Sequence, residues 1–198
     1  AELSISSHDP LRAFDGKGLC AHCGHTMKFY CYDCLVPSPA LQDQLPRGLS
    51  LPTHVLLWKH PSERSSKATG LQAKILAPSD VMVIVQHPSE GGALIAPHDP
   101  SRTLLLYPCD DAQPLSAIDP ASHDALVVIE ATWQQSRAMV NTLRRTHPAI
   151  RPVTLSARVE TKFWRHQDVG PHCLATIEAI YYALRDIAEK RDMRTSRL

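Results

Sequence analysis

Four short apolar runs, each bounded by turn-forming residues, constrain the fold of this chain more than any other feature. They read HVLLWK (54–59), VMVIVQ (81–86), RTLLLY (102–107) and ALVVIE (125–130), with PVTL (152–155) as a weaker fifth. Runs of this length and composition are typical of buried strands. Helical patterns fall between and after them, at about 67–76, 133–145 and 173–192. Strands that alternate with helices predict an α/β fold with a largely parallel sheet and flanking helices.

The last helical pattern carries an apolar stripe at spacings of three and four, formed by Leu174, Ile177, Ile180, Tyr181, Leu184 and Ile187. We expect this stripe to pack on the sheet. No apolar stretch approaches the roughly 18 residues that a membrane span needs, so no membrane partner is expected. The first residues lack the basic flank and apolar block of a signal peptide, and we therefore expect a cytoplasmic protein.

Residues 20–34, CAHCGHTMKFYCYDC, contain two Cys-x-x-Cys pairs, Cys20/Cys23 and Cys31/Cys34. Each pair can form a tight knuckle, and two knuckles complete a tetrahedral site of four thiolates. The spacing predicts a structural Zn²⁺ site, with iron as the weaker alternative and disulfides or free thiols as the alternative to a metal. His22 and His25 are close enough in sequence to replace a cysteine as ligand.

These patterns divide the chain into an N-terminal arm with zinc knuckles (1–36), a linker with four prolines (37–52) and an α/β domain (53–198). The two remaining cysteines, Cys109 and Cys173, stand apart from the pairs, and we expect both to be small buried apolar residues.

Ligands of parallel sheets bind at the carboxyl ends of the strands. The segments that follow the predicted strands are therefore site candidates: HPSER (60–64), YPCDDA (107–112) and EATWQQ (130–135). The sequence has no glycine-rich dinucleotide motif, no P-loop and no nucleophile elbow, which excludes the commonest dinucleotide, nucleotide-hydrolysing and serine-hydrolase sites.

Charge is distributed unevenly along the chain. Residues 1–133 carry 9 Lys and Arg against 14 Asp and Glu, whereas residues 134–198 carry 12 against 6. A basic C-terminal third indicates either a face for a polyanion or an arginine-rich solvated helix, and charge alone does not separate the two.

Five sequence blocks in a fixed order resemble one family. They are the paired Cys-x-x-Cys knuckles, KHPSERSSKATG, LLLYPCDDA, IEATW and FWRHQDVGPHCLATIEAIYYAL. In this order, over about residues 18–188, they are similar to the DTW-domain family of tRNA-uridine aminocarboxypropyltransferases. The resemblance implies transfer of the 3-amino-3-carboxypropyl group of S-adenosylmethionine to N3 of a uridine in tRNA, which leaves 5′-methylthioadenosine. It also implies kinship with SPOUT-type methyltransferases and hence a C-terminal knot.

The resemblance implies a catalytic set in the IEATW block: Glu130, Thr132 and Trp133. Glu130 stands where the family has Asp, and it would act as general base for the uridine N3 proton. The extra methylene extends the reach of the carboxylate by more than about 1 Å, and a misplacement of about 1 Å can lower a rate about 100-fold. Trp133 is read either as a packing residue or as a platform on which the uracil stacks.

The resemblance also implies donor-binding residues, namely Thr69, Gly70, Leu106, Tyr107, Pro108 and the stretch Gly170–Thr176, which includes Leu174. Candidates for the RNA or for the donor carboxylate are Lys59, His60, Arg165 and His166. Lys59 and His60 are otherwise solvated polar residues at a strand end. Glu178 either orients the 170–176 stretch or is an acid favoured by the helix dipole.

Two further functions fit the same residues. One is an RNA methyltransferase of the SPOUT type that uses the same donor. The other is a zinc-ribbon RNA-binding protein with weak or no catalysis. The sequence leaves the oligomeric state open.

Overall fold

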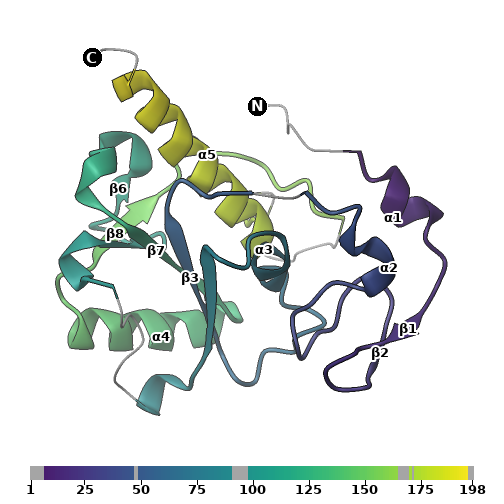
Figure 1. Cartoon of the computed structure of the whole chain (residues 1–198). Helices are drawn as coiled ribbons and strands as arrows, with labels where there is room; N and C mark the ends of the chain where they lie inside the picture. The colour runs from purple at the N-terminus through teal and green to yellow at the C-terminus, as the bar shows by residue number, and fades with distance from the viewer. Residues whose placement is uncertain (1–6, 47–48, 91–97, 165–169, 171, 196–198) are drawn as a thin grey trace.

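Figure 1 shows a computed structural model of the chain, which describes residues 7–46, 49–90, 98–164, 170 and 172–195. Its body is a six-stranded sheet in the order β4-β3-β7-β5-β8-β6, and every neighbouring pair is parallel. The strands are β3 (His54–Lys59), β4 (Val81–Val85), β5 (Thr103–Leu106), β6 (Gln113–Pro114), β7 (Ala125–Glu130) and β8 (Arg151–Thr154). The predicted parallel α/β fold is confirmed, and β6 is an addition to it.

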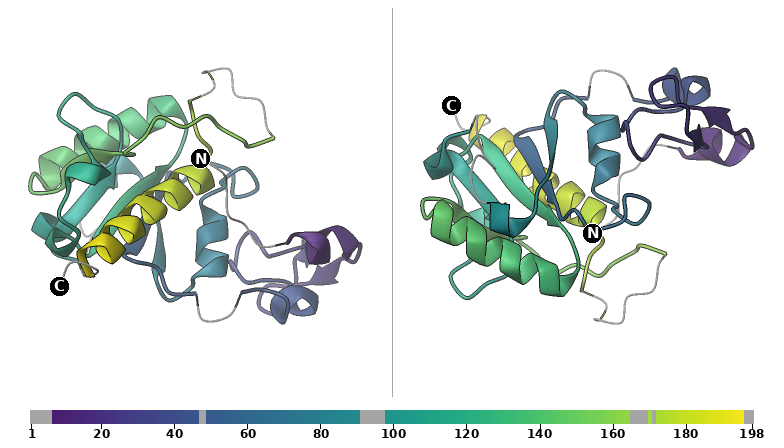
Figure 2. Two further views of the ribbon diagram at one scale, coloured as in Figure 1. Left: turned by 90° about the horizontal axis from the view of Figure 1, so that it is seen from above. Right: turned by 90° about the horizontal axis from the view of Figure 1, so that it is seen from below.

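Helices cover both faces of the sheet, as Figure 2 shows. On one face lie α3 (Leu71–Leu76) and α5 (Thr176–Thr195), and on the other lies α4 (Trp133–Thr146). Alternate residues of β3 reach the two cores: Val55 and Leu57 pack with the first pair of helices, Leu56 and Trp58 with α4. Because both faces are covered, the central strands are apolar at nearly every position.

The predicted stripe of α5 packs in the first core through Ile180 and Ile187, with Ile177 and Leu184 at its margin. The predicted helix starts are wrong by a few residues. α3 begins at Leu71 rather than near 67. The Gly70 N–H donates to the Glu130 carboxylate and so does not bond to a carbonyl of a preceding helical turn. α5 begins at Thr176 rather than 173, because the Ala175 N–H donates to the Glu178 carboxylate and the Cys173 N–H to the Gly170 carbonyl, and neither donates to a preceding helical turn.

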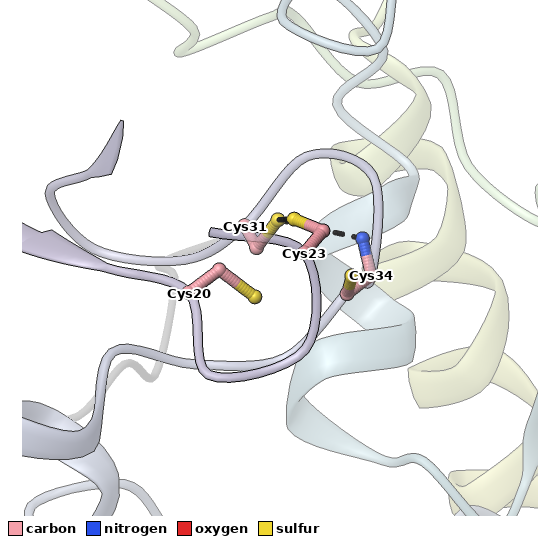
Figure 3. Close-up of side chains that lie close together, drawn as sticks. All are labelled: Cys20, Cys23, Cys31 and Cys34. Atoms are coloured by element: carbon pink, nitrogen blue, oxygen red, sulfur yellow. Dashed lines mark hydrogen bonds between the residues drawn. The ribbon is translucent and has the colours of Figure 1, made fainter. Parts of the chain in front are cut away.

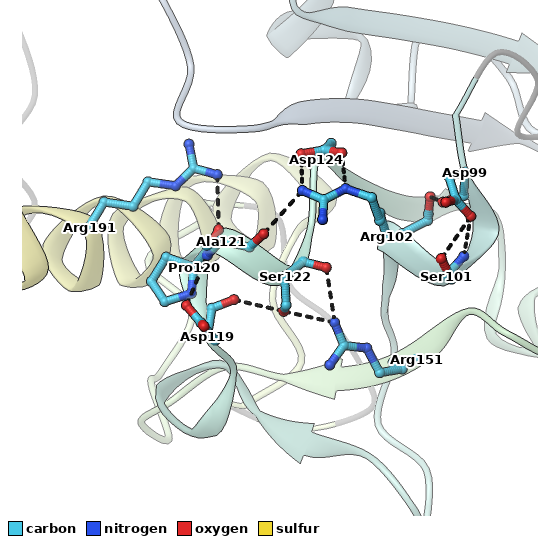
Figure 4. Close-up of polar contacts among 11 residues, drawn as sticks. Asp99, Ser101, Arg102, Asp119, Pro120, Ala121, Ser122, Asp124, Arg151 and Arg191 are labelled. Carbon is cyan, nitrogen blue, oxygen red and sulfur yellow. Dashed lines mark hydrogen bonds and ion pairs between the residues drawn. The ribbon is translucent and has the colours of Figure 1, made fainter.

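Arginines close the amino edge of the sheet, where β5, β7 and β8 begin (Figure 4). Arg102 forms an ion pair with Asp124 and donates to its Oδ1 at 2.7 Å. Arg151 donates to the Ser122 hydroxyl at 2.8 Å, and Arg191 donates to the Pro52 and Pro120 carbonyls. Part of the positive charge of the C-terminal third is therefore used inside the fold, at the amino edge of the sheet.

The N-terminal part lies beside α3 and contains α1 (Asp9–Ala13), the hairpin of β1 (Gly18–Leu19) and β2 (Thr26–Met27), and α2 (Pro39–Gln42). The predicted linker thus contains a short helix, whose Leu41 is buried. Four single-turn 3₁₀ helices occupy loops of the body: Pro88–Glu90, Pro100–Arg102, Leu115–Ala117 and Pro120–Ser122. No helix within the described residues is long and apolar enough to cross a membrane.

Candidate active site

A cavity of about 380 Å³ opens at the carboxyl edge of the sheet. The ends of β5, β7 and β8, the start of α4 and residues 172–176 form its walls. These segments are far apart in the sequence and meet because parallel strands bring their carboxyl ends to one edge. The volume lies in the range of small-molecule sites.

Eight of the predicted site residues line this cavity: Thr69, Leu106, Tyr107, Pro108, Glu130, Trp133, Leu174 and Thr176. Five others lie outside its lining: Lys59, His60, Gly70, Thr132 and Gly170. Arg165 and His166 fall outside the described residues. The cavity is therefore the place where the donor-binding and catalytic predictions meet.

Glu130 ends β7 and is only 6% exposed. Its Oε2 accepts a hydrogen bond from the Gly70 N–H at 2.5 Å, and its Oε1 accepts one from the Thr176 hydroxyl at 3.0 Å. A Cβ at position 70 would lie 2.7 Å from Oε2 and 2.8 Å from Leu57 Cδ1, so only glycine permits this approach. The carboxylate thus joins the carboxyl end of β7 to the starts of α3 and α5.

Burial raises the pKa of Glu130 to about 7, against the lowering effect of the Gly70 and Thr176 hydrogen bonds. The negative charge of Glu63 raises it further, and the positive charge of Lys59 lowers it. Lys59 lies opposite Glu130 in the β3–β7 register and is 5% exposed. A carboxyl that titrates near neutral pH, at the wall of a cavity, is suited to take up a proton from a bound substrate.

Lys59 and His60 are both buried, so the expectation that they are solvated polar residues is wrong. The Ser62 N–H donates to His60 Nδ1 at 3.2 Å, and the ring packs edge-on against His87. Burial lowers the pKa of His60, which favours the neutral ring. Neither side chain is presented to solvent as a phosphate contact would require.

Thr132 is the N-cap of α4. Its hydroxyl accepts from the Gln135 N–H at 3.4 Å, while the Gln135 side chain accepts from the Thr132 N–H at 3.0 Å, which completes a capping box. The cap fixes the first turn of the helix, and Trp133 occupies that turn with 46% of its surface exposed. The tryptophan lines the cavity and also faces solvent.

One segment, residues 159–164, runs beside the cavity and contributes one residue to its lining; we call it the strap. Its Phe163 lines the cavity, and the Val159 carbonyl accepts from His172 Nδ1 at 3.1 Å. Glu178 in the first turn of α5 accepts from the Thr161 hydroxyl and the Lys162 N–H, both at 2.7 Å. It also accepts from the Ala175 N–H at 2.9 Å. Glu178 therefore holds the strap and the 172–175 stretch against one helix.

Several lining residues were not predicted singly, among them Lys67, Ser136, Phe163, His172 and Cys173. Lys67, His172 and Cys173 lie within blocks already assigned to the donor, and Ser136 follows Trp133 by one helical turn. Cys109 and Cys173 are partly exposed rather than buried, because both lie in loops at the carboxyl edge. Only their position after strands, and not their residue type, could have indicated this.

The four cysteines of the knuckles converge on one point, as Figure 3 shows. All four sulfur atoms lie within 4.8 Å of one another, and Cys23 Sγ is 3.6 Å from Cys31 Sγ. Cys20 and Cys31 are buried with Met27 in a small cluster. His25 lies beside this cluster: its Nδ1 is 2.6 Å from the Asp33 carboxylate, and His25, Asp33 and Cys23 form a second group whose possible ligand atoms lie within 4.8 Å of one another.

Comparison with known proteins gives one consistent result. The DTW domain matches residues 28–198. The chain is 31% identical over 225 residues to tRNA-uridine aminocarboxypropyltransferase 1 of Xenopus tropicalis. The aligned region covers 93% of this chain and 75% of the relative. It is 28% identical over 235 residues to the human protein of the same name, with 92% and 76% covered. No solved structure matches the chain.

Proposed function

This chain belongs to the DTW-domain family, and on that premise we propose that it is a tRNA-modifying transferase. Its reaction would move the 3-amino-3-carboxypropyl group of S-adenosylmethionine to N3 of a uridine in tRNA. The observation that carries the proposal is Glu130, a buried carboxylate with a pKa near 7 at the wall of a cavity of small-molecule size. A compartment that holds both tRNA and the donor, such as the cytoplasm, is part of the proposal.

The donor would bind in the cavity between Leu106–Pro108, Thr69 and residues 172–176. The support is geometric, since these segments come from separate parts of the chain and line one space. The C-terminal knot also belongs to this proposal. Residues 172–175 cross the carboxyl edge beside β7 and β8 before the chain enters α5, which is where a SPOUT-like fold holds its donor.

The chemistry requires that uridine N3 lose its proton as it forms a bond to the carbon that the donor sulfur releases. The carbon–sulfur bond breaks, its electron pair stays on sulfur, and neutral methylthioadenosine leaves. Glu130 would receive the N3 proton. Its burial supports this role, because a desolvated carboxylate binds a proton more tightly than an exposed one. The Gly70 and Thr176 hydrogen bonds would hold the carboxylate in place.

Trp133 would stack on the target uracil, since it lines the cavity and is half exposed at the start of α4. The Thr132 capping box would support that position from behind. Lys59 would act through Glu130 rather than on the RNA, because it is buried beside the carboxylate.

We propose that Cys20, Cys23, Cys31 and Cys34 bind a structural Zn²⁺. In a tetrahedral site with Zn–S distances of about 2.3 Å, sulfur atoms lie about 3.8 Å apart. The observed sulfur separations are compatible with that figure. Four thiolates leave no open position, so the ion would stabilise the fold of the knuckles and take no part in the transfer.

The spent donor distinguishes this function from its nearest alternative. We expect incubation with S-adenosylmethionine and bulk tRNA to yield methylthioadenosine, measured by liquid chromatography with mass detection. S-adenosylhomocysteine in its place would identify a methyltransferase. Absence of both, with intact metal and tRNA binding, would leave an RNA-binding protein.

A further inference from the structure

The chain has three tryptophans, and they occupy very different environments. Trp58 is buried in the core on the α4 side, and its Nε1 donates to the Gln86 carbonyl at 2.9 Å. Trp133 is half exposed at the cavity. Trp164 is 82% exposed, the most exposed of the large apolar side chains in the described part of the chain. A ring with this exposure presents an aromatic surface that a ligand in solution can reach.

Trp164 lies at the cavity rather than on a distant surface. Its ring centroid is 6.0 Å from that of Phe163, and the two planes are inclined by 33°. Phe163 itself lines the cavity. The exposed tryptophan is therefore one ring away from the space in which the donor and the uracil would meet.

The strap has two distinct sides. Exposure alternates along it: Val159, Thr161 and Phe163 are partly buried, whereas Glu160, Lys162 and Trp164 are exposed. This is the pattern of an extended segment with one face inward. The inward residues bind His172 and Glu178 and line the cavity. The outward side chains face solvent, where a ligand can reach them.

Two of the three outward side chains, Lys162 and Trp164, fit a single-stranded nucleic acid. Proteins bind unpaired nucleotides by stacking bases on aromatic rings next to cations that contact the phosphates. The strap presents Trp164 with Lys162 two residues earlier. α4 repeats the combination, since exposed Arg137 follows Trp133 by one turn. Glu178 fixes the strap through the Lys162 N–H, so the platform is ordered before the ligand arrives.

We propose that Trp164 is a stacking platform for a nucleotide that flanks the target uridine in tRNA, and that Lys162 contacts the adjoining phosphate. The inference rests on the proposed function, since it assumes that the cavity receives a uridine of tRNA. The target base would enter the cavity beside Trp133, while its neighbour stays outside on the strap. A tRNA loop would thereby be recognised at two bases instead of one.

The test compares Trp164→Ala, Trp164→Phe and Lys162→Ala with the unchanged chain. Leu19→Ala is the matched control, because Leu19 is 67% exposed and lies in β1, outside the cavity lining. tRNA affinity is measured by gel shift, which needs no turnover, and donor affinity by calorimetry without tRNA.

We expect Trp164→Ala to weaken tRNA binding roughly tenfold or more and Trp164→Phe to weaken it about threefold at most, because phenylalanine keeps a stacking face. Donor affinity should stay within about twofold in both. Lys162→Ala should reduce the slope of log affinity against log salt by about one. Leu19→Ala should change none of these quantities.

tRNA affinity that is equal in Trp164→Ala and Leu19→Ala would overturn the inference and assign the ring to a protein contact. Equal loss of donor affinity in both Trp164 variants would overturn it too, because the ring would then only support Phe163. Failure of the proposed function has a separate signature. The unchanged chain would make no modified uridine, while Trp164→Ala would still weaken its binding to tRNA.

Discussion

The cysteine knuckles and the carboxyl edge of the sheet both bring reactive side chains together, and they do so with opposite consequences. In the knuckles, four thiols point at one another, and the small apolar cluster around them consists of buried Cys20, Met27 and Cys31 with Cys34 and Val36 packed against it. At the sheet edge, two large apolar cores hold the scaffold, and Glu130 is left to face a cavity. With the proposed metal bound, the four thiolates would leave no position for a substrate, whereas the cavity is open. Access to a cavity, more than burial, therefore separates a structural site from a catalytic one.

Removal of the proposed metal should produce the largest effect. We expect that effect to be confined to the cysteine knuckles and to leave the sheet intact. Structural zinc contributes about 10 kcal/mol or more of folding free energy in small domains, and the knuckles have little core to replace it. We expect Cys31→Ser to lose the ion and to make residues 18–36 sensitive to protease, while the sheet keeps its circular dichroism.

Cys109→Ser is the control for that experiment, because Cys109 lies outside the cluster. Equal metal content in Cys31→Ser and Cys109→Ser, measured by plasma mass spectrometry, would contradict the proposed metal site in the knuckles.

Glu130→Gln should have the reverse pattern, with chemistry lost and fold kept. General-base removal lowers a rate by about 10² to 10⁴. The glutamine is nearly isosteric and carries no charge to desolvate, so the melting temperature at pH 8 should not fall. Glu189→Gln, exposed on the far part of α5, serves as control for loss of an acid. Near-normal transfer by Glu130→Gln in single-turnover measurements would refute the assignment.

The pKa of Glu130 fixes the sign of two pH dependences. The basic form predominates above about pH 7, so transfer should rise through pH 7 and then level off. The folded chain holds the proton more tightly than an unfolded carboxyl with its ordinary pKa of 4.5. This group therefore favours the folded state at low pH, and its contribution is lost as pH rises from about 4.5 through 7. Both dependences should disappear in Glu130→Gln.

Glu178→Ala tests whether donor binding in the cavity depends on the strap and on residues 172–175. The carboxylate accepts three hydrogen bonds from the strap and the 172–175 stretch. We expect the donor dissociation constant to rise about tenfold, since hydrogen bonds to charged groups contribute about 1.5 to 3 kcal/mol each and part of that is recovered by water. Glu178→Gln should recover part of the affinity. Calorimetry that finds unchanged donor binding in Glu178→Ala would separate the strap from the donor site.

Thr132→Ala should have the smallest effect, on stability. Loss of an N-cap costs about 1 kcal/mol, which corresponds to roughly 2 to 4 °C in a chain of this size. Thr146→Ala, at the opposite end of α4, is the control. A more than tenfold loss of transfer by Thr132→Ala at unchanged melting temperature would show that the hydroxyl contacts a substrate instead of capping the helix.

The sequence predicted the strands well, because their signal is local. β3 and β7 begin and end at the expected residues, since each is an apolar run buried on both faces and bounded by turns. β6 was missed, because two residues, Gln113 and Pro114, carry no pattern. The starts of α3 and α5 were misplaced because contacts with residues distant in the sequence decide them.

The candidate site was predictable as a set of segments and not as a set of contacts. Strand ends indicated Glu130, Tyr107 and Pro108, since parallel strands bring such residues to one edge, and the family resemblance added Leu106. The partners of Glu130 are 60 and 46 residues away in the sequence, and no periodicity encodes them. The burial of Lys59 and His60 could not be predicted either. They lie at the end of an apolar run, and such a run can end at the surface.

The most direct test of aminocarboxypropyl transfer with Glu130 as general base follows the donor carbons into tRNA. The unchanged chain and Glu130→Gln are incubated with bulk tRNA and S-adenosylmethionine labelled either in the aminocarboxypropyl carbons or in the methyl group. The tRNA is then digested to nucleosides and analysed by mass spectrometry. We expect a modified uridine that carries the aminocarboxypropyl label, made by the unchanged chain and at least about 100-fold more slowly by Glu130→Gln. Methyl label in the tRNA, or equal yields from the two chains, would contradict it.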